Sequence, residues 1–138
     1  MNTEHPCIFC KIALGQIPSS KIYEDEKFFA FLDIHPRNSG HALVIPKQHA
    51  RWVWDIADAG RFFEVARKIA KAQQKALGTE YIVSCVFGEE VHHAHLHLIP
   101  RYPHDGHGGS IDFSIVRNVT PLELQDVAAK IKAALATV

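Results

Sequence analysis

The segment HAHLHLIP at residues 93–100 alternates histidine with apolar side chains. In an extended strand, successive side chains point to opposite faces. A strand over residues 94–100 therefore places the row of His93, His95 and His97 on one face and the apolar side chains on the other. The apolar face can pack into a core, whereas the other presents imidazoles, which act as base, nucleophile or metal ligand near neutral pH.

This row of three imidazoles admits three interpretations. It is a histidine-rich strand at the surface, a zinc site of the His-x-His type, or a site at which a neutral imidazole attacks phosphorus and forms a covalent intermediate. In the third case, a neighbouring histidine protonates the leaving group or stabilises the phosphate oxygens. The spacing alone does not choose between metal ligand and nucleophile.

Outside this segment, turn residues and hydrophobic periodicity predict short strands and two helices. Further strands are expected at residues 22–24, 27–32, 41–45 and 81–87, the first two as a hairpin. Helical spacing predicts a helix over residues 59–77 that Gly78 ends, and a capping box at Thr120 begins a helix through about Leu135. This order of hairpins and helices is typical of an α+β fold with an antiparallel sheet.

The composition is that of a globular protein. The chain has 138 residues, 47% of them hydrophobic and 22% charged, enough to bury a core. Its 15 basic and 15 acidic residues balance, so no global field recruits nucleic acid. It shows neither a long apolar run nor a signal-peptide pattern, and its three cysteines fit a reducing compartment. We expect one cytoplasmic domain over residues 1–138, without a nucleic acid or a membrane as partner.

Cys7 and Cys10 form a C-x-x-C pair. A redox role would require a βαβ context, which the pattern does not show. A structural zinc site would require two more ligands, for which His49 and His93 are available. Two buried thiols without a metal are the other interpretation, and the spacing leaves the choice open.

Two polar positions have both a structural and a functional interpretation. Asp33 follows an apolar strand and is either a turn residue or a carboxylate that accepts hydrogen bonds from hydroxyl groups, such as those of a ribose. The segment HDGH at residues 104–107 is expected to be a solvated loop, with loose metal binding as the alternative.

Together, these segments resemble the histidine triad (HIT) family, in particular its small Hint-like branch. The family signature is His-φ-His-φ-His-φ-φ, with φ apolar, and residues 93–99 match it in full. Other segments resemble the N-terminal half of the family in the same order: CIFCKI at 7–12, GQIP at 15–18, YED at 23–25, AFLDI at 30–34 and GHALVIPKQH at 40–49. The resemblance covers roughly residues 7–101, and a loop and helix over residues 102–138 follow it.

The resemblance implies a fold and a reaction. The fold is α+β, an antiparallel sheet of about five strands with a long central helix and a C-terminal helix, usually paired as a homodimer. The reaction is hydrolysis or transfer at the α-phosphate of a nucleotide, a nucleoside phosphoramidate or a dinucleoside polyphosphate, with a purine base. His95 is implied as the nucleophile that forms a nucleotidyl-histidine intermediate. His97 is implied as its partner at the phosphate oxygens or the leaving group.

The resemblance also implies binding residues. In zinc-containing relatives, including the galactose-1-phosphate uridylyltransferase branch, a C-x-x-C pair joins a downstream histidine and the first histidine of the motif. Two cysteines and two histidines make a closed tetrahedral site, hence a structural zinc. The implied zinc ligands are Cys7, Cys10, His49 and His93. The implied nucleotide pocket, with Asp33 on the ribose hydroxyls, is Ile8, Phe9, Ile12, Phe31, Asp33, Ile34 and His41.

One segment departs from the family pattern. Hint-like enzymes usually carry Gly-Gln-x-Val before the triad, often with serine at x, whereas residues 88–91 read GEEV and the asparagine expected near Val86 is missing. At 4 Å, two like unit charges repel by about 1 kcal/mol in water and about 4 at an effective dielectric of 20. Either Glu89 and Glu90 therefore point away from the phosphate, or the substrate differs, or catalysis is weakened; a role of Glu90 as proton donor or base is the alternative. A nucleotide-binding or sensing module with weak or no catalysis is therefore the competing hypothesis, and a zinc hydrolase with the triad as metal ligands is a third.

Overall fold

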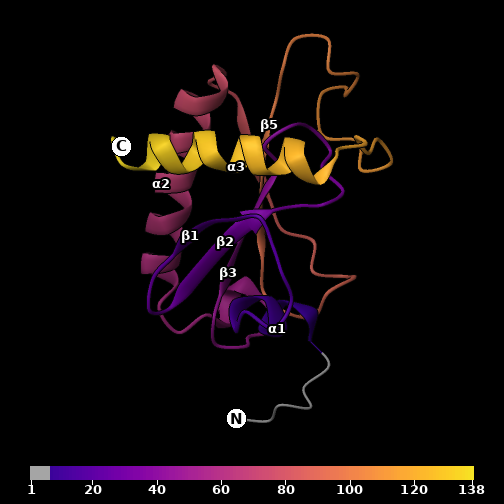
Figure 1. Cartoon of the computed structure of the whole chain (residues 1–138). Helices are drawn as coiled ribbons and strands as arrows, with labels where there is room; N and C mark the ends of the chain where they lie inside the picture. Colours follow the sequence, from indigo (N-terminus) through magenta and orange to yellow (C-terminus); the bar gives the residue numbers. More distant parts are fainter. Residues whose placement is uncertain (1–6) are drawn as a thin grey trace.

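The computed structural model describes residues 7–138, which form an antiparallel five-stranded sheet with helices (Figure 1). The strands follow one another in the sheet in the order β1-β2-β3-β5-β4, with β1 and β4 at the edges. Their bounds are β1 Lys21–Glu24, β2 Phe28–Leu32, β3 Ala42–Pro46, β4 Ile82–Cys85 and β5 Leu96–Pro100. The helices are α1 Ile8–Ala13, α2 Ala59–Leu77 and α3 Pro121–Leu135, with a 3-10 turn η1 at Val53–Asp55. The α+β class expected from the sequence is confirmed.

Side-chain alternation along the central strands divides the interior into two cores. Because both faces of the sheet are covered, β2, β3 and β5 are buried along their whole length. The core between the sheet and the helices α2 and α3 includes Phe28, Ala30, Leu32, Ala42, Val44, Leu96, Leu98, Phe62, Ile69 and Ile131. The core on the opposite face, where α1 packs, comprises Phe9, Ile12, Phe29, Phe31, Leu43 and Ile45. The functional residues predicted from the sequence gather on this second face.

The two long helices begin and end at the residues that the sequence indicates. The Asp58 side chain accepts a hydrogen bond from the Arg61 amide at the start of α2, and Gly78 ends that helix with φ of 66°. Thr120 accepts from the Glu123 amide at the start of α3. The helices predicted over residues 59–77 and from Thr120 to about Leu135 are confirmed.

The structure differs from the sequence-based expectations around the histidine row. β4 and β5 pair only from Ile82 opposite Pro100 to Cys85 opposite His97. Beyond this point the chain leaves the ladder and turns at Gly88, which has φ of +73°. β5 is therefore shorter than the strand predicted over residues 94–100, and His95 as well as His93 precedes it. The short helix α1 was not predicted; the Cys7 side chain accepts a hydrogen bond from the Cys10 amide at its start.

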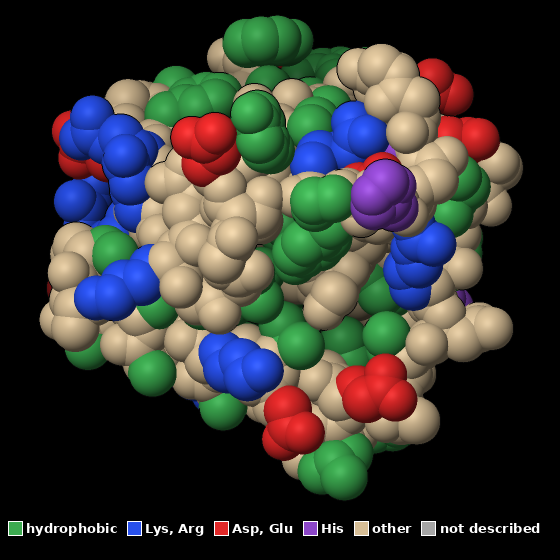
Figure 2. Space-filling view, turned by 90° about the horizontal axis from the view of Figure 1, so that it is seen from above, with side chains coloured by type: hydrophobic (Ala, Val, Ile, Leu, Met, Phe, Trp, Pro, Cys, Tyr) green, Lys and Arg blue, Asp and Glu red, His purple; other side chains and the backbone are tan. Residues whose placement is uncertain are grey.

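The surface carries charges of both signs. Seen from above, acidic and basic side chains are interspersed with apolar ones, and a histidine side chain reaches the surface among them (Figure 2). This mixture agrees with the balanced formal charge of the chain. Among the described residues, no helix has the length and hydropathy required to cross a bilayer.

Candidate active site

A cavity of about 700 Å³ lies on the sheet face opposite α2 and α3. Ligand cavities commonly have about 300–1,000 Å³, so this one can hold a nucleotide-sized molecule. Most of the residues that the resemblance implies for nucleotide and phosphate binding line it, namely Ile8, Phe9, Ile12, Phe31, Asp33, Ile34, His95 and His97. Glu89 and Glu90, in the segment that departs from the family pattern, also line it.

The backbone fixes the proton position on His95. The Nδ1 atom of its ring lies 2.7 Å from the carbonyl oxygen of His93. Because a carbonyl oxygen only accepts hydrogen bonds, Nδ1 carries the proton and Nε2 carries the lone pair. Burial lowers the pKa of His95, although this hydrogen bond and the Asp33 carboxylate partly oppose the shift. The ring is therefore a neutral imidazole with a nucleophilic Nε2 at the cavity wall.

A chain of hydrogen bonds fixes the proton of His97 on Nε2, the opposite tautomer to that of His95. The backbone amide of Arg37 donates to His41 Nδ1 over 3.1 Å, so the His41 proton is on Nε2. This Nε2 lies 2.9 Å from His97 Nδ1 and donates to it, which leaves the His97 proton on Nε2. His97 thus offers the cavity an N–H donor beside the lone pair of His95.

Burial keeps this histidine pair neutral. It lowers the pKa of His41 to about 3, with the neighbouring His97 and Arg37 acting in the same direction. Burial likewise lowers the pKa of His97 to about 3, aided by His95 and Arg37. Near pH 7, His97 is consequently a neutral hydrogen-bond donor that carries no formal charge.

His41 lies behind His97 and is not part of the cavity wall. Its exposed fraction is 1%, and it is hydrogen-bonded to the His97 ring, which lines the cavity. Asp33, His41 and His97 also have potential ligand atoms within 4.8 Å of one another. The facing nitrogens of the His41 and His97 rings are hydrogen-bonded to each other, and this bond sets the tautomer of His97.

Asp33 lines the cavity at the end of β2. Its Oδ1 accepts a hydrogen bond from the His35 amide over 2.8 Å. Its Oδ2 lies 3.7 Å from His41 Nε2 and 3.9 Å from an Arg37 nitrogen. Burial raises the pKa of Asp33, and the His35 amide and the Arg37 charge oppose this. The carboxylate retains lone pairs with which it can accept ligand hydroxyl groups.

The cavity also contains residues that the sequence did not single out. Arg37 lies beside Asp33, and Phe87, Phe113 and Val116 line the end of the cavity near His97. The Phe87 and Phe113 rings have centroids 5.9 and 5.4 Å from that of His97. Arg37 could have been suspected from its loop between Asp33 and His41, but nothing in the sequence near Phe113 indicates a site.

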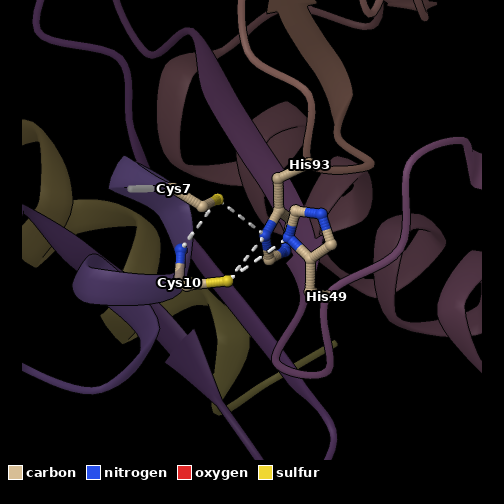
Figure 3. A group of neighbouring side chains, drawn as sticks. All are labelled: Cys7, Cys10, His49 and His93. Atoms are coloured by element: carbon tan, nitrogen blue, oxygen red, sulfur yellow. Dashed lines mark hydrogen bonds between the residues drawn. The ribbon is translucent and has the colours of Figure 1, made fainter. Parts of the chain in front are cut away.

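A second cluster contains the four implied zinc ligands. Cys7 and Cys10 are at the start of α1, His49 follows β3, and His93 precedes β5. Figure 3 shows their side chains converging from these separate segments, and their ligand atoms all lie within 4.8 Å of one another. The Nε2 atom of His93 donates to the Pro46 carbonyl over 2.7 Å, so its Nδ1 can accept or bind a metal.

The spacing of this cluster fits a tetrahedral ion. Zinc bonds of about 2.3 Å to sulfur and 2.0–2.1 Å to nitrogen place a sulfur and a nitrogen ligand about 3.6 Å apart. His93 Nδ1 lies 3.2 Å from the Cys7 sulfur and 3.4 Å from the Cys10 sulfur, which is also 3.4 Å from His49 Nδ1. Burial and the adjacent Cys7 raise the pKa of Cys10 to about 12. A cation would reverse this shift, because metal binding stabilises thiolates.

The comparison with known proteins identifies the family. The family model of the HIT domain matches residues 14–104. The chain belongs to the HIT family. It is 41% identical to a HIT-like protein of Methanocaldococcus jannaschii, over 91% of this chain and 98% of that protein. It is 36% identical to an adenosine 5'-monophosphoramidase of Schizosaccharomyces pombe, over 91% and 98%.

A solved HIT structure supports the same conclusion. The crystal structure of a zinc-bound histidine triad family protein from Mycobacterium smegmatis superposes with a TM-score of 0.79 at 32% identity. The match covers 95% of this chain and 94% of that one. The fold and family expected from the sequence are therefore confirmed, and the Cys/His cluster is a candidate metal site within that fold.

Proposed function

We propose that this HIT protein is a nucleotide hydrolase or nucleotidyl transferase that acts at the α-phosphate of a nucleoside phosphoramidate. The observation that carries this proposal is the pair of opposite tautomers, a lone pair on His95 Nε2 beside an N–H on His97. Relatives named as adenosine 5'-monophosphoramidases support both the phosphoramidate and a purine base.

The reaction proceeds in two displacements at phosphorus. In the first, the His95 Nε2 lone pair forms a bond to phosphorus, and the phosphorus–nitrogen bond of the substrate breaks. The electron pair of that bond goes to the leaving amine, which takes a proton from solvent. In the second, water attacks phosphorus, the bond to Nε2 breaks, and the water proton goes to solvent. The products are a nucleoside monophosphate and an amine, and His95 is regenerated.

Each neighbouring group has a defined task in this reaction. His97 is neutral near pH 7, so it donates a hydrogen bond to a phosphate oxygen instead of transferring a full proton. The His93 carbonyl stabilises the imidazolium that forms when His95 is bonded to phosphorus, because it accepts from Nδ1. The apolar wall that includes Phe9 and Phe31 receives the base, and Asp33 accepts the ribose hydroxyls.

Glu89 and Glu90, in the segment that differs from the family pattern, favour an amine over a phosphate as the leaving group. Glu89 and Glu90 are exposed residues that line the cavity, and the Glu90 charge reaches His95. A polyphosphate leaving group would bring further negative charge to this wall, whereas an amine leaving group would not. A phosphoramidate is therefore a better substrate than a dinucleoside polyphosphate.

The test replaces the nucleophile. Adenosine 5'-phosphoramidate is supplied to the wild type and to His95→Ala, and AMP release is followed by chromatography. We expect His95→Ala to lose turnover by at least about 10³-fold, because covalent catalysis has no substitute nucleophile. The matched control is His92→Ala, an exposed histidine in the same segment, which should retain activity. Undiminished turnover by His95→Ala would refute the role of His95.

The second candidate function is a nucleotide-binding or sensing module with little catalysis. Glu89 and Glu90 favour it, because they place negative charge where an incoming phosphate docks. Titration calorimetry of the wild type with AMP, run beside the hydrolysis assay, separates the two functions. Binding without turnover favours the module, and turnover favours the hydrolase.

We further propose that the Cys/His cluster binds a structural zinc ion. The donor set and its spacing support this assignment, as does a zinc-bound relative of the same fold. The zinc would join α1, and with it part of the cavity wall, to the segment that carries His95. All four protein ligands close the tetrahedron, so the ion takes no part in the displacement at phosphorus.

The oligomeric state and compartment complete the proposal. Among the described residues, β4 is an edge strand that pairs with β5 alone, so a second copy of the chain can extend the sheet there to form a homodimer. Sedimentation equilibrium should give twice the chain mass, and a monomer mass would contradict this.

None of the cysteines forms a disulfide, which supports a reducing compartment, the cytoplasm.

A further inference from the structure

The loop after β5 has a buried carboxylate where the sequence predicts a solvated loop. Residues 105–120 follow the segment that the HIT family model matches. His104 and Gly106 are exposed, as expected for a solvated loop at residues 104–107, but the Asp105 side chain is only 5% exposed. A carboxylate loses its hydration on burial, which is tolerated only when donors surround it.

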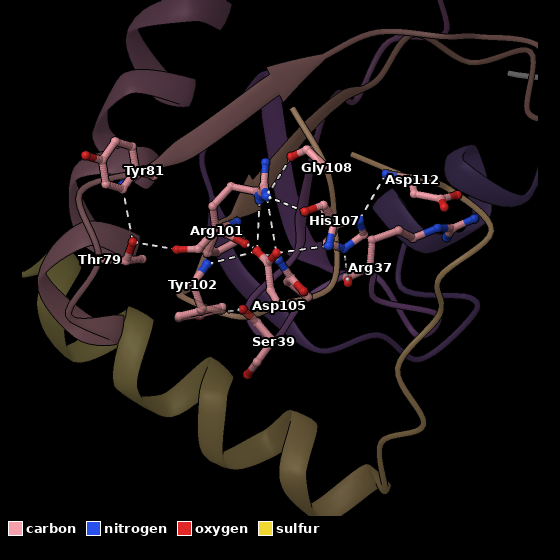
Figure 4. Close-up of polar contacts among 12 residues, drawn as sticks. Arg37, Ser39, Thr79, Tyr81, Arg101, Tyr102, Asp105, His107, Gly108 and Asp112 are labelled. Atoms are coloured by element: carbon pink, nitrogen blue, oxygen red, sulfur yellow. Dashed lines mark hydrogen bonds and ion pairs between the residues drawn. The ribbon is translucent and has the colours of Figure 1, made fainter. Parts of the chain in front are cut away.

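Five hydrogen bonds converge on this carboxylate (Figure 4). Arg101 donates to both oxygens, over 2.8 and 3.2 Å. The Asn38 side-chain amide and the Tyr102 backbone amide donate to Oδ2, and the His107 backbone amide donates to Oδ1. The Arg101 guanidinium holds the pKa of Asp105 well below its usual range. Asp105 is thus an ionised centre that joins the loop to Asn38.

The same network fixes the backbone before β3. Asn38 is 2% exposed and accepts from Arg117 through its Oδ1 over 3.0 Å. Arg117 also donates to the carbonyl of Arg37 and to that of Asp105. His107 Nε2 donates to the Arg37 carbonyl over 2.9 Å, because its Nδ1 accepts from the Asp112 amide. The Arg37 peptide is therefore held from the loop side by two donors.

Arg37 connects this network to His41 and His97. Its backbone amide donates to His41 Nδ1 and so sets the tautomers of His41 and His97. Its guanidinium donates to the Phe113 carbonyl over 3.3 Å and lies 4.8 Å from the centre of the Phe113 ring. Phe113 in turn packs edge-on against both His41 and His97.

We propose that Asp105 is a positioning residue of the active site, which acts through Asn38, Arg117 and Arg37. It holds the Arg37 amide on His41 Nδ1, and this hydrogen bond keeps the proton of His97 on the nitrogen that contacts the phosphate. It also holds Phe113 against the His97 ring. The catalytic part of this inference rests on the proposed hydrolase function, whereas the tautomer part does not.

The chemistry of the network requires a carboxylate at this position. Both oxygens of Asp105 accept only, and every group around them donates. In Asp105→Asn, one oxygen becomes an NH₂ group that faces these donors, and Arg101 loses its counter-charge. Arg101 is half-buried, and without its counter-charge it no longer holds the carboxylate, so we expect the loop and the Arg37 segment to shift.

The first measurement is kinetic and uses adenosine 5'-phosphoramidate as the probe. Asp105→Asn should lower kcat by on the order of 10-fold or more, while KM changes less than about 3-fold, because the lost donor acts on the phosphate during displacement. Asp126→Asn is the control, because Asp126 is an exposed carboxylate on α3 that takes no part in this network. It should leave both constants unchanged.

The second measurement is nitrogen NMR of the imidazoles, which requires no substrate. In the wild type, His41 and His97 should each show a single neutral tautomer, with the proton on Nε2. In Asp105→Asn, the shifts of both rings should move toward the average of two tautomers. If the wild type hydrolyses nothing, the proposed function fails, and these spectra alone decide the role of Asp105.

A third variant guards against a folding defect. Arg117→Lys keeps the charge but loses the forked donor that joins Asn38 to the Arg37 carbonyl, so it should show a smaller change of the same kind. If Asp105→Asn does not fold, Arg117→Lys still tests whether this network positions His41 and His97. A lower melting temperature with unchanged kcat and unchanged single tautomers would make Asp105 merely structural and would overturn the proposal.

Discussion

The buried pair of His41 and His97 makes the stability of this protein depend on pH. Both rings have a pKa of about 3 in the folded protein, mainly because of burial. In the unfolded chain, a histidine takes up its proton near pH 6.5. Between these values the unfolded state binds more protons than the folded state, so the free energy of unfolding falls as the pH falls.

The size of this effect follows from the two pKa values. Between pH 7.5 and 5.5, each ring contributes a loss of about 1.4 kcal/mol, because the unfolded form becomes protonated while the folded form does not. The two rings together contribute roughly 3 kcal/mol. Domains commonly have about 5–15 kcal/mol of stability, so this loss is large enough to measure.

Urea unfolding at pH 7.5, 6.5 and 5.5 tests this prediction. The comparison is between the wild type and His41→Gln/His97→Gln, which lacks both rings but retains every other histidine. The wild type should lose roughly 3 kcal/mol more than this variant over the range. As a control, His35→Gln/His92→Gln removes two exposed rings and should follow the wild type. Equal losses in the wild type and the His41/His97 variant would refute the reasoning.

Three further changes have expected outcomes. Cys7→Ser/Cys10→Ser should reduce bound zinc from about one ion per chain to near zero by elemental analysis; retained zinc would favour the triad as the metal site. Gly40→Ala should destabilise the protein by about 2–4 kcal/mol in urea, because φ is +87° and a Cβ would collide with the last leucine of α2. Glu89→Gln/Glu90→Gln should raise turnover of a diadenosine polyphosphate about 10-fold, with adenosine 5'-phosphoramidate turnover nearly unchanged; no gain would show that these carboxylates do not select the leaving group.

Local signals were sufficient to predict most of the fold. The hairpin of β1 and β2 and the bounds of α2 and α3 follow from turn residues, helical spacing and caps, all of which act over a few residues. The ends of β4 and β5 did not follow, because strand length depends on where the partner strand stops pairing. Helix α1 is too short for a periodic signal and depends on the Cys7 cap.

For the histidine triad, too, the sequence predicted some features, whereas others depend on tertiary contacts. The alternation at residues 93–99 established that histidines share one side of the chain, and the family match followed from it. It could not assign separate roles, because a role depends on which partner each ring nitrogen meets. His93 contacts the two cysteine sulfurs, His95 donates to a carbonyl, and His97 accepts from His41.

The sequence by itself thus determined the order of the strands and of the two long helices, the family, and the histidines that are candidates for the reaction. Only the tertiary structure decided their tautomers, their neutrality and the closure of the cavity. Asp105 illustrates the reason, because its environment in the loop reads as polar and solvated in the sequence. Its side chain is only 5% exposed in the fold, where the Asn38 side-chain amide, distant in the chain, lies 2.9 Å from its Oδ2. Burial and hydrogen-bond direction are properties of such long-range contacts, which local sequence patterns do not encode.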